Sequence, residues 1–463
     1  MSDTESVAVT RSLAEYASSA DLCDMPEDVA EIARRSLVDT VGVTIAARGD
    51  DAVGILRTTL GGELPPGDAT VLTDGTLTNA RTAALVNATA GHALDYDDVT
   101  DLTYGHPSVV LWPALLAAAE TGRRTGRELL EAFVIGFQVQ CAVASGMAVR
   151  THYGRGWHST ATIGVLGAAA GVARLHGLDV DQTRCALGLA ASMAGGSRQN
   201  FGTMTKPLHP GLAARDAVFA ADLAGNGFTA DPDQLESALG YFAMFGDSND
   251  LTAVEKTLQT PWALTAEGLS VKKYACCYCT HRTADATIDL VHEDGVDAGE
   301  VRSVQLTLEP AGFDPLIHHR PTTGLQGKFS AEYVIAAALL DKRVTLATFT
   351  DDAVQRPEAQ QLLRKVEVDE QERPPVGPAQ WEQAYAVVQV DTARGPVTKR
   401  VDVPRGDRRA PLDRDGIEVK FRDCVEFSGS GIDADALLTQ LWNFDTSTAF
   451  RGFDAVRSAG TAA

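Results

Sequence analysis

Apolar residues recur at intervals of three and four positions over most of the first 270 residues, which is the period of an amphipathic helix. The first such run follows Asp24 and Pro26, two residues that are typical of a helix start. Further runs predict helices over 79–95, 113–121, 128–149, 160–176, 182–194, 211–226 and 234–245. Alternation typical of strands is scarce here, so we expect this part to be mostly helical.

The pattern changes after about residue 270. Positions 301–308 alternate between apolar and polar side chains, which predicts a strand, and 384–390 and 397–403 flank a turn at 392–395, which predicts a hairpin. The same part of the chain contains helical patterns, namely a helix at 330–340, a short helix within exposed loops at 356–380, and a last helix at 434–444.

These patterns predict a mostly α protein of two domains. A large all-helical domain is expected to comprise residues 1–270 and 405–463, and a smaller α+β domain, 271–404, is expected to be inserted into it. A length of 463 residues is compatible with this division.

Composition places the chain among ordinary globular proteins, because 44% of its residues are hydrophobic and 22% are charged. The first 20 residues lack the basic stretch and apolar run of a secretory signal. Apolar stretches such as 109–119 are too short and too interrupted to cross a bilayer. We therefore expect a cytoplasmic protein that has no membrane partner.

The formal net charge of −22 argues against nucleic acid as a partner, since phosphate contacts need clustered Lys and Arg. Only nine of the 40 basic residues are Lys, and the first of them is Lys206. An acidic protein that binds an anionic substrate has to concentrate positive charge in one place. The few lysines in apolar or glycine-rich surroundings, Lys206, Lys272 and Lys273, are therefore candidates for binding or chemistry.

Seven cysteines, an odd number, do not suggest a disulfide framework. Cys276, Cys277, Cys279 and His281 lie within six residues, but structural zinc usually requires two separated ligand pairs. Adjacent cysteines cannot easily both point inward, and no second pair stands elsewhere in the chain. We therefore predict no metal, and a catalytic or packing role for Cys277 and for His281.

Imidazoles and one carboxylate occur beside predicted helix ends. His92 and Asp95 are three residues apart and share a helix face, while His106 and His158 each precede a predicted helix. Taken singly, each of these residues could be an ordinary helix cap or a solvated side chain. Together they could supply proton-transfer groups to one pocket.

Cations occur in two further segments. The polar loop 197–211 contains Arg198, Thr203 and Lys206 and leads into a helix, whose free N–H groups favour anions. The segment 271–281 contains Lys272 and Lys273. If these segments converge with the imidazoles, they form a positively charged pocket of the kind that a di- or tricarboxylate requires.

Five stretches of the chain, taken in order, resemble the MmgE/PrpD family: 92–98, 106–108, 202–214, 227–230 and 272–281. This family includes 2-methylcitrate dehydratase, cis-aconitate decarboxylase and an iminodisuccinate epimerase. The resemblance implies a large helical domain with a smaller α+β lid, usually in a homodimer. It also implies pocket residues at the following positions, with Cys277 or His281 nearby: Asp95, His106, His158, Lys206 and Lys272.

Three departures bear on the substrate. Family members of the decarboxylase type carry Thr where this chain has Val99, His where it has Cys277, and an aromatic residue where it has 316–319. These differences favour a dehydratase over a decarboxylase. The loop 205–209 is nevertheless unlike that of the enterobacterial 2-methylcitrate dehydratases, so the resemblance leaves the substrate open.

The leading hypothesis is a lyase of the dehydratase type that acts on a small di- or tricarboxylate. Lys272 or His158 would be the base and His106 the acid, and Asp95 would orient His106 or sustain its protonation. Lys272 can be a base only if its pKa falls, as burial and the neighbouring Lys273 would cause. The substrate would be held by residues from both cationic segments, namely Arg198, Thr203, Lys206, Lys273 and His281.

Two alternatives remain. An epimerase acting on a dicarboxylate such as iminodisuccinate would need one base to remove an α-proton, and a helical scaffold would need none. No cofactor is expected, because the sequence has neither a Walker loop nor a dinucleotide fingerprint.

Overall fold

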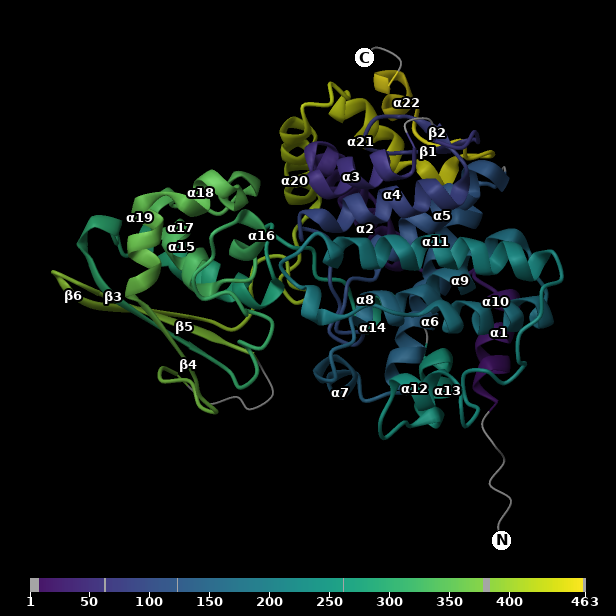
Figure 1. Ribbon diagram of the computed structural model, residues 1–463, viewed down its shortest axis with the longest axis horizontal. Coiled ribbons are helices and arrows are strands. Elements are labelled where there is room, and N and C mark those ends of the chain that lie inside the picture. The colour runs from purple at the N-terminus through teal and green to yellow at the C-terminus, as the bar shows by residue number, and fades with distance from the viewer. Residues whose placement is uncertain (1–7, 62–63, 123, 261, 378–383, 461–463) are drawn as a thin grey trace, which may run out of the picture.

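The computed structural model describes residues 8–61, 64–122, 124–260, 262–377 and 384–460, and most of these residues are helical (Figure 1). The mostly α class is therefore confirmed. The larger helical part is built from the longer helices α1 (Val9–Ser19), α2 (Glu27–Ala46), α3 (Asp51–Thr59), α4 (Ala80–Ala93), α5 (Ser108–Gly122), α6 (Gly126–Ser145), α9 (Gly164–His176), α10 (Val180–Met193), α11 (Thr205–Gly225) and α13 (Leu251–Gln259). Short helices connect them, namely α7 (Val149–Gly154), α8 (Ser159–Thr162), α12 (Tyr241–Phe245) and α14 (Ala263–Ala266).

Helices α5 and α6 form the centre of the larger hydrophobic core. Trp112 of α5 stacks on Phe133 of α6 with ring centroids 4.1 Å apart, and both side chains are fully buried. By length and composition alone, α6 could cross a membrane, but 83% of its most apolar window is buried inside the protein. Its apolar character is explained by this burial, because a helix enclosed by other helices is apolar all round.

Close contact between α4 and α11 positions the segments that carry the polar residues discussed below. Gly211 of α11 faces α4, and a Cβ atom at this position would overlap the Thr89 hydroxyl and lie 2.8 Å from the Leu85 carbonyl oxygen. The two backbones can approach this closely only because Gly211 has no side chain.

Replacing Gly211 by Ala is therefore expected to destabilise the protein by about 1–3 kcal/mol, the usual cost of overpacking a core. Equilibrium unfolding in urea measures this change. Gly54→Ala is the matched control, since Gly54 also lies within a helix but a Cβ there would contact nothing within 4 Å. That control should be neutral or stabilising, by at most about 1 kcal/mol; equal destabilisation of both variants would contradict the packing argument.

A smaller part contains a four-stranded sheet in the order β4-β3-β5-β6 (Figure 1). Its strands are β3 (Val301–Leu308), β4 (Val366–Glu370), β5 (Ala386–Thr392) and β6 (Gly395–Val401), of which β3 and β4 are parallel and the other neighbours antiparallel. Helices α15 (His281–His292) and α17 (Ala331–Asp341) pack against the sheet, and three shorter helices lie beside them: α16 (Gly324–Gly327), α18 (Asp351–Gln355) and α19 (Pro357–Leu362).

The chain then returns to the larger helical part with α20 (Arg414–Ser428), α21 (Ala434–Trp442) and α22 (Asp454–Gly460). Both α20 and α21 pack on α2. Lys420 of α20 is buried and forms an ion pair with Asp39 of α2 at 2.6 Å. The C-terminal helices therefore lie beside helices from the start of the chain (Figure 1).

Most of the predicted elements exist, including the strand at 301–308 and the hairpin, but several details were wrong. Helix α5 starts five residues before Pro113, and α11 starts at Thr205, so Lys206 lies on a helix rather than in a loop. Residues 234–240 form turns, because Gly240 interrupts the expected helix there. Strand β4 and helix α20 were not predicted; both are rich in charged residues, which conceal their apolar faces. Part of the predicted stretch 356–380 lies outside the described residues.

Candidate active site

A cavity of about 180 Å³ lies between the loop after α4, the start of α11 and the segment that leads into α15. We call it the central cavity. Six of the residues expected to bind substrate or act in catalysis line it, namely Asp95, His106, His158, Lys206, Lys272 and Cys277. Segments that are far apart in the sequence thus contribute to a single site.

Asp95 and two lysines form a buried charge cluster at this cavity. One carboxylate oxygen of Asp95 lies 2.5 Å from Nζ of Lys206 and 3.1 Å from Nζ of Lys272. Lys272 also donates a hydrogen bond to the Asp95 carbonyl oxygen at 2.9 Å. All three residues are at most 4% exposed. Two ammonium groups against one carboxylate leave a net positive charge, which suits an anionic substrate.

The backbone at Asp95 makes this arrangement possible. Asp95 has φ = 51°, in the left-handed region that Asp tolerates better than most residues. This conformation follows directly on the end of α4, so the chain turns sharply and both the carboxylate and the carbonyl of Asp95 meet Lys272. Burial alone would raise the pKa of Asp95, but the two lysines outweigh it and hold that pKa well below its usual range.

The surroundings of Lys272 favour a role in charge stabilisation over the predicted role as the base. Burial alone would lower the pKa of Lys272, but the carboxylates of Asp95 and Asp97 outweigh burial and raise it. The lysine therefore stays protonated at neutral pH. We assign Lys272 to charge stabilisation instead.

Asp97, rather than Asp95, contacts the imidazole of His106. Oδ2 of Asp97 lies 3.1 Å from Nδ1 of His106 and 2.8 Å from Nδ1 of His92. Asp97 is fully buried, and although burial raises its pKa, the two imidazoles outweigh this and lower it well below the usual value. The orienting contact that was expected from Asp95 is therefore made by Asp97, because the left-handed turn directs the Asp95 carboxylate to the lysines.

His106, which was expected to be the acid, has the surroundings of a general base. Burial lowers its pKa despite the opposing effect of Asp97, so the ring is neutral at pH 7 and can accept a proton. With Nδ1 at the carboxylate, Nε2 is the nitrogen left for the substrate, and Asp97 would stabilise the imidazolium that forms. The residue precedes α5, as the sequence predicted.

His158 offers a second neutral imidazole to the cavity. Its Nδ1 lies 3.0 Å from Nδ1 of His209, so one ring donates this hydrogen bond and the other accepts it. Burial lowers the pKa of His158 well below 6.5, and nearby His92 and Lys206 lower it further. His158 is thus a candidate for the second proton-transfer group.

Four residues expected to bind substrate do not line the central cavity. Arg198 donates to the Tyr153 carbonyl oxygen at 2.7 Å and stacks on the Tyr153 ring, Thr203 is exposed, and Lys273 is half-buried away from the cavity. His281 is fully buried and packs between Tyr274 and Tyr278. Arg198 and His281 thus make packing contacts inside the protein, and Thr203 and Lys273 lie outside the cavity lining.

Cys277 lines the cavity together with Cys279. A hydrogen bond from the Cys279 thiol lowers the pKa of Cys277, which would otherwise rise through burial. Aromatic residues also line the cavity: Nζ of Lys206 lies 5.3 Å from the ring centre of Phe201 and 5.0 Å from that of Phe329. These two rings could not be recognised from the sequence, since single aromatic residues are usual in any core.

Four side chains of metal-binding type come together beside the cavity, namely His92, Asp95, Asp97 and His106, with ligand atoms within 4.8 Å of one another. The ammonium groups of Lys206 and Lys272 contact the same Asp95 carboxylate, and they would repel a cation at this place. The Asp95 carboxylate of this group is therefore better suited to pairing with the two lysines than to binding a metal ion.

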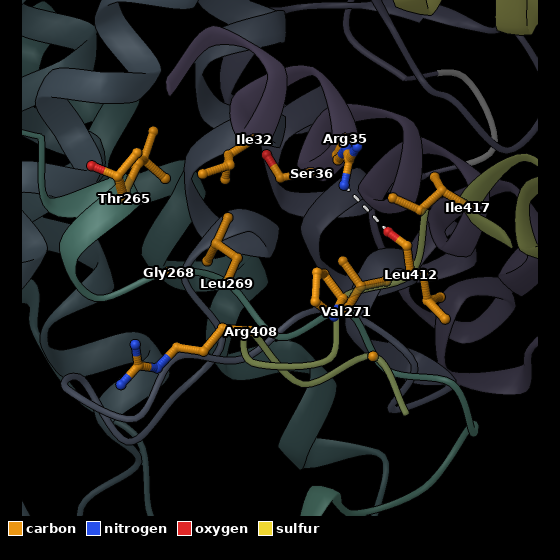
Figure 2. A pocket seen from close by; sticks show the side chains of 13 residues that line it. Ile32, Arg35, Ser36, Thr265, Gly268, Leu269, Val271, Arg408, Leu412 and Ile417 are labelled. Carbon is orange, nitrogen blue, oxygen red and sulfur yellow. Dashed lines mark hydrogen bonds between the residues drawn. The ribbon is translucent and has the colours of Figure 1, made fainter. Parts of the chain in front are cut away.

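A further cavity of about 180 Å³ lies where the two connections between the parts of the chain pass α2 (Figure 2). Its polar contacts are structural, such as the hydrogen bond from Arg35 Nη1 to the Leu412 carbonyl oxygen at 3.3 Å. Among the described residues, those that line it include no imidazole, carboxylate or lysine, which are the usual groups for proton transfer.

A helical chain whose cavity is lined by two ammonium groups and two imidazoles, one of which is backed by the Asp97 carboxylate, has the equipment for acid–base chemistry on a carboxylate. The chain belongs to the MmgE/PrpD family: the MmgE/PrpD N-terminal domain matches residues 11–253 and the C-terminal domain matches residues 274–443. The resemblance seen in the sequence is thus confirmed.

Known relatives include several cis-aconitate decarboxylases. The protein of that name from Mus musculus is 30% identical over 363 residues, which cover 73% of this chain and 70% of the relative. The one from Homo sapiens is 30% identical over 350 residues, covering 73% and 71%. The one from Aspergillus terreus is 28% identical over 382 residues, covering 77% of each chain.

Proposed function

We propose that this chain is a lyase that acts on a small tricarboxylate by acid–base proton transfer and without a cofactor. The observation that carries the proposal is the convergence of the Asp95–Lys206–Lys272 cluster in one cavity with His106, whose Nδ1 contacts the buried Asp97. The kinship with cis-aconitate decarboxylases supports a tricarboxylate as the substrate.

In this proposal the lysines bind a substrate carboxylate and stabilise the negative charge that develops when a neighbouring proton leaves. Such preorganised charges are usually the largest single contribution to a reaction of this kind. His106 removes the proton, and Asp97 stabilises the resulting imidazolium. In a dehydration the imidazolium of His106 then returns the proton to the departing hydroxyl, and in a decarboxylation the carbanion takes its proton from the Lys272 ammonium.

Loss of water from a hydroxy-tricarboxylate such as 2-methylcitrate is the first candidate reaction. Val99 and Cys277 both line the central cavity, and these are two of the positions where decarboxylase-type members of the family carry Thr and His. The cavity would therefore offer different polar contacts to its substrate. Decarboxylation of cis-aconitate is the second candidate, and the names of the relatives favour it.

The purified protein can be tested against 2-methylcitrate, cis-aconitate and chiral iminodisuccinate. Dehydration would produce a conjugated double bond, seen as a rise in ultraviolet absorbance. Decarboxylation would release CO₂ from cis-aconitate and favour the second candidate. Deuterium uptake with racemisation and no new chromophore would indicate an epimerase instead. Absence of turnover with all three and with related tricarboxylates would overturn the proposal.

The division into a helical domain (1–270 and 405–463) and an α+β lid (271–404) is part of the proposal. It is supported by the cavity lining, because Asp95 and Lys206 come from the first part and Lys272 and Phe329 from the second. A homodimer in the cytoplasm also remains a prediction.

A further inference from the structure

Beside the central cavity lies a larger one, of about 430 Å³, whose polar lining is dominated by arginines. Its charged lining residues are Arg150, Arg282, Arg409 and Asp101. We call this cavity the arginine vestibule. Arg150 and Arg282 line the central cavity as well, so they stand at the junction of the two.

Arg282 is a buried cation that lacks an acidic partner among the described residues. It lies in the first turn of α15, is 8% exposed, and donates from Nε to the Asp402 carbonyl oxygen at 2.8 Å. No carboxylate in the described part of the chain forms an ion pair with its guanidinium. A buried charge without a counter-charge is costly, so the position favours an anion.

Arg150 and Arg409 differ in how far they are neutralised. Arg150 of α7 is exposed, and within the described ranges it also lacks an ion pair. Arg409 is held by Asp407 through hydrogen bonds of 2.8 and 3.0 Å. Arg150 and Arg282 therefore carry the positive charge that is available at the junction, opposed by Asp101 and by Glu309 of the central cavity.

We infer that Arg150 and Arg282 form an outer carboxylate subsite, which binds the substrate carboxylate farthest from Lys206 and Lys272. This inference rests on the proposed function. All four cations line the central cavity of about 180 Å³, so one small anion can reach both groups. A guanidinium presents paired donors that fit a carboxylate. On a chain of net charge −22, such a site would also offset the repulsion of an approaching anion.

The subsite predicts selectivity for an anion with a second, distant carboxylate over an anion with only one, which can be measured without turnover. Calorimetric titration would compare tricarballylate, a saturated tricarboxylate, with propionate, which has one carboxylate and cannot occupy both groups of cations at once. Arg282→Gln and Arg150→Ala should each weaken tricarballylate binding by about tenfold or more, the range for a charged hydrogen bond. Propionate, whose single carboxylate the inner lysines hold alone, should lose less than about threefold.

Arg343→Ala is the control, because Arg343 is exposed and lies outside both cavities. Circular dichroism and thermal unfolding would verify that Arg282→Gln is folded, and the exposed position of Arg150 provides a second variant that tolerates truncation. Unchanged tricarballylate affinity in both variants, or equal losses for both anions, would overturn the subsite and leave the proposed function standing. Failure of the wild type to bind either anion would overturn both.

Discussion

Replacing His106 by Gln is expected to lower kcat on the tricarboxylate substrate by about 10²–10⁴-fold, the usual contribution of a general acid or base. Gln preserves a polar side chain of similar reach but cannot accept a proton from carbon. The geometry behind this expectation is the 3.1 Å approach of Asp97 to Nδ1 of His106, which leaves Nε2 for the substrate. Steady-state kinetics would measure the effect, with KM changing much less than kcat.

The pH profile provides an independent check on His106. The neutral ring is the active base, and its pKa lies below the ordinary value of 6.5, so wild-type kcat/KM should fall only as the pH drops below that value. His292→Gln, at an exposed histidine outside both cavities, should leave rate and profile unchanged. Loss of activity in His292→Gln equal to that in His106→Gln, or full activity in His106→Gln, would refute the assignment.

Asp95→Asn is expected to destabilise the protein by about 3–5 kcal/mol at neutral pH, because it leaves two buried ammonium groups without their carboxylate. The pKa of Asp95 is lowered in the folded state, so its stabilisation is present above the unfolded value, near 4, and is lost as the pH falls through the folded value. The difference between variant and wild type should therefore be largest near pH 7 and shrink in acid. Urea unfolding at several pH values would measure it.

Asp435→Asn is the matched control for this experiment. Asp435 pairs with Arg422 at 3.0 Å, but its side chain is 80% exposed, and solvent screens such a pair. We expect a change below about 1 kcal/mol. If the two variants lost equal stability, or if the loss in Asp95→Asn did not depend on pH, the buried cluster would not be the source of the effect.

The fold could be predicted wherever the apolar pattern was simple. Strand β3 matches its predicted range, and α17 and α21 match theirs to within two residues, because their apolar positions are regular and their ends are marked by polar residues. Helix α20 was not predicted because its buried face includes a charged residue, Lys420. The charge of Lys420 is neutralised by Asp39, which lies near the start of the chain. A contact between residues so far apart in the sequence cannot be recognised from the local pattern of apolar and polar residues.

The composition of the site could be predicted better than its internal connections. The clustering of His106, His158, Lys206 and Lys272 was foreseeable, since an acidic chain with few lysines must gather its cations to hold an anion. Which carboxylate contacts which cation was not foreseeable, because this depends on the positive φ of Asp95. That single backbone angle sends Asp95 to the lysines and leaves Asp97 for the imidazoles.

The distribution of lysines has a practical consequence for chemical labelling. Lys206, Lys272, Lys328 and Lys420 are each at most 5% exposed, which leaves five of the nine lysine side chains accessible to an acylating reagent. Amine-directed cross-linkers and fluorophores would thus attach at few sites, all of them away from the cavity lining. Mass-spectrometric detection of acylated Lys206 or Lys272 in the native protein would accordingly report that the buried interior had opened.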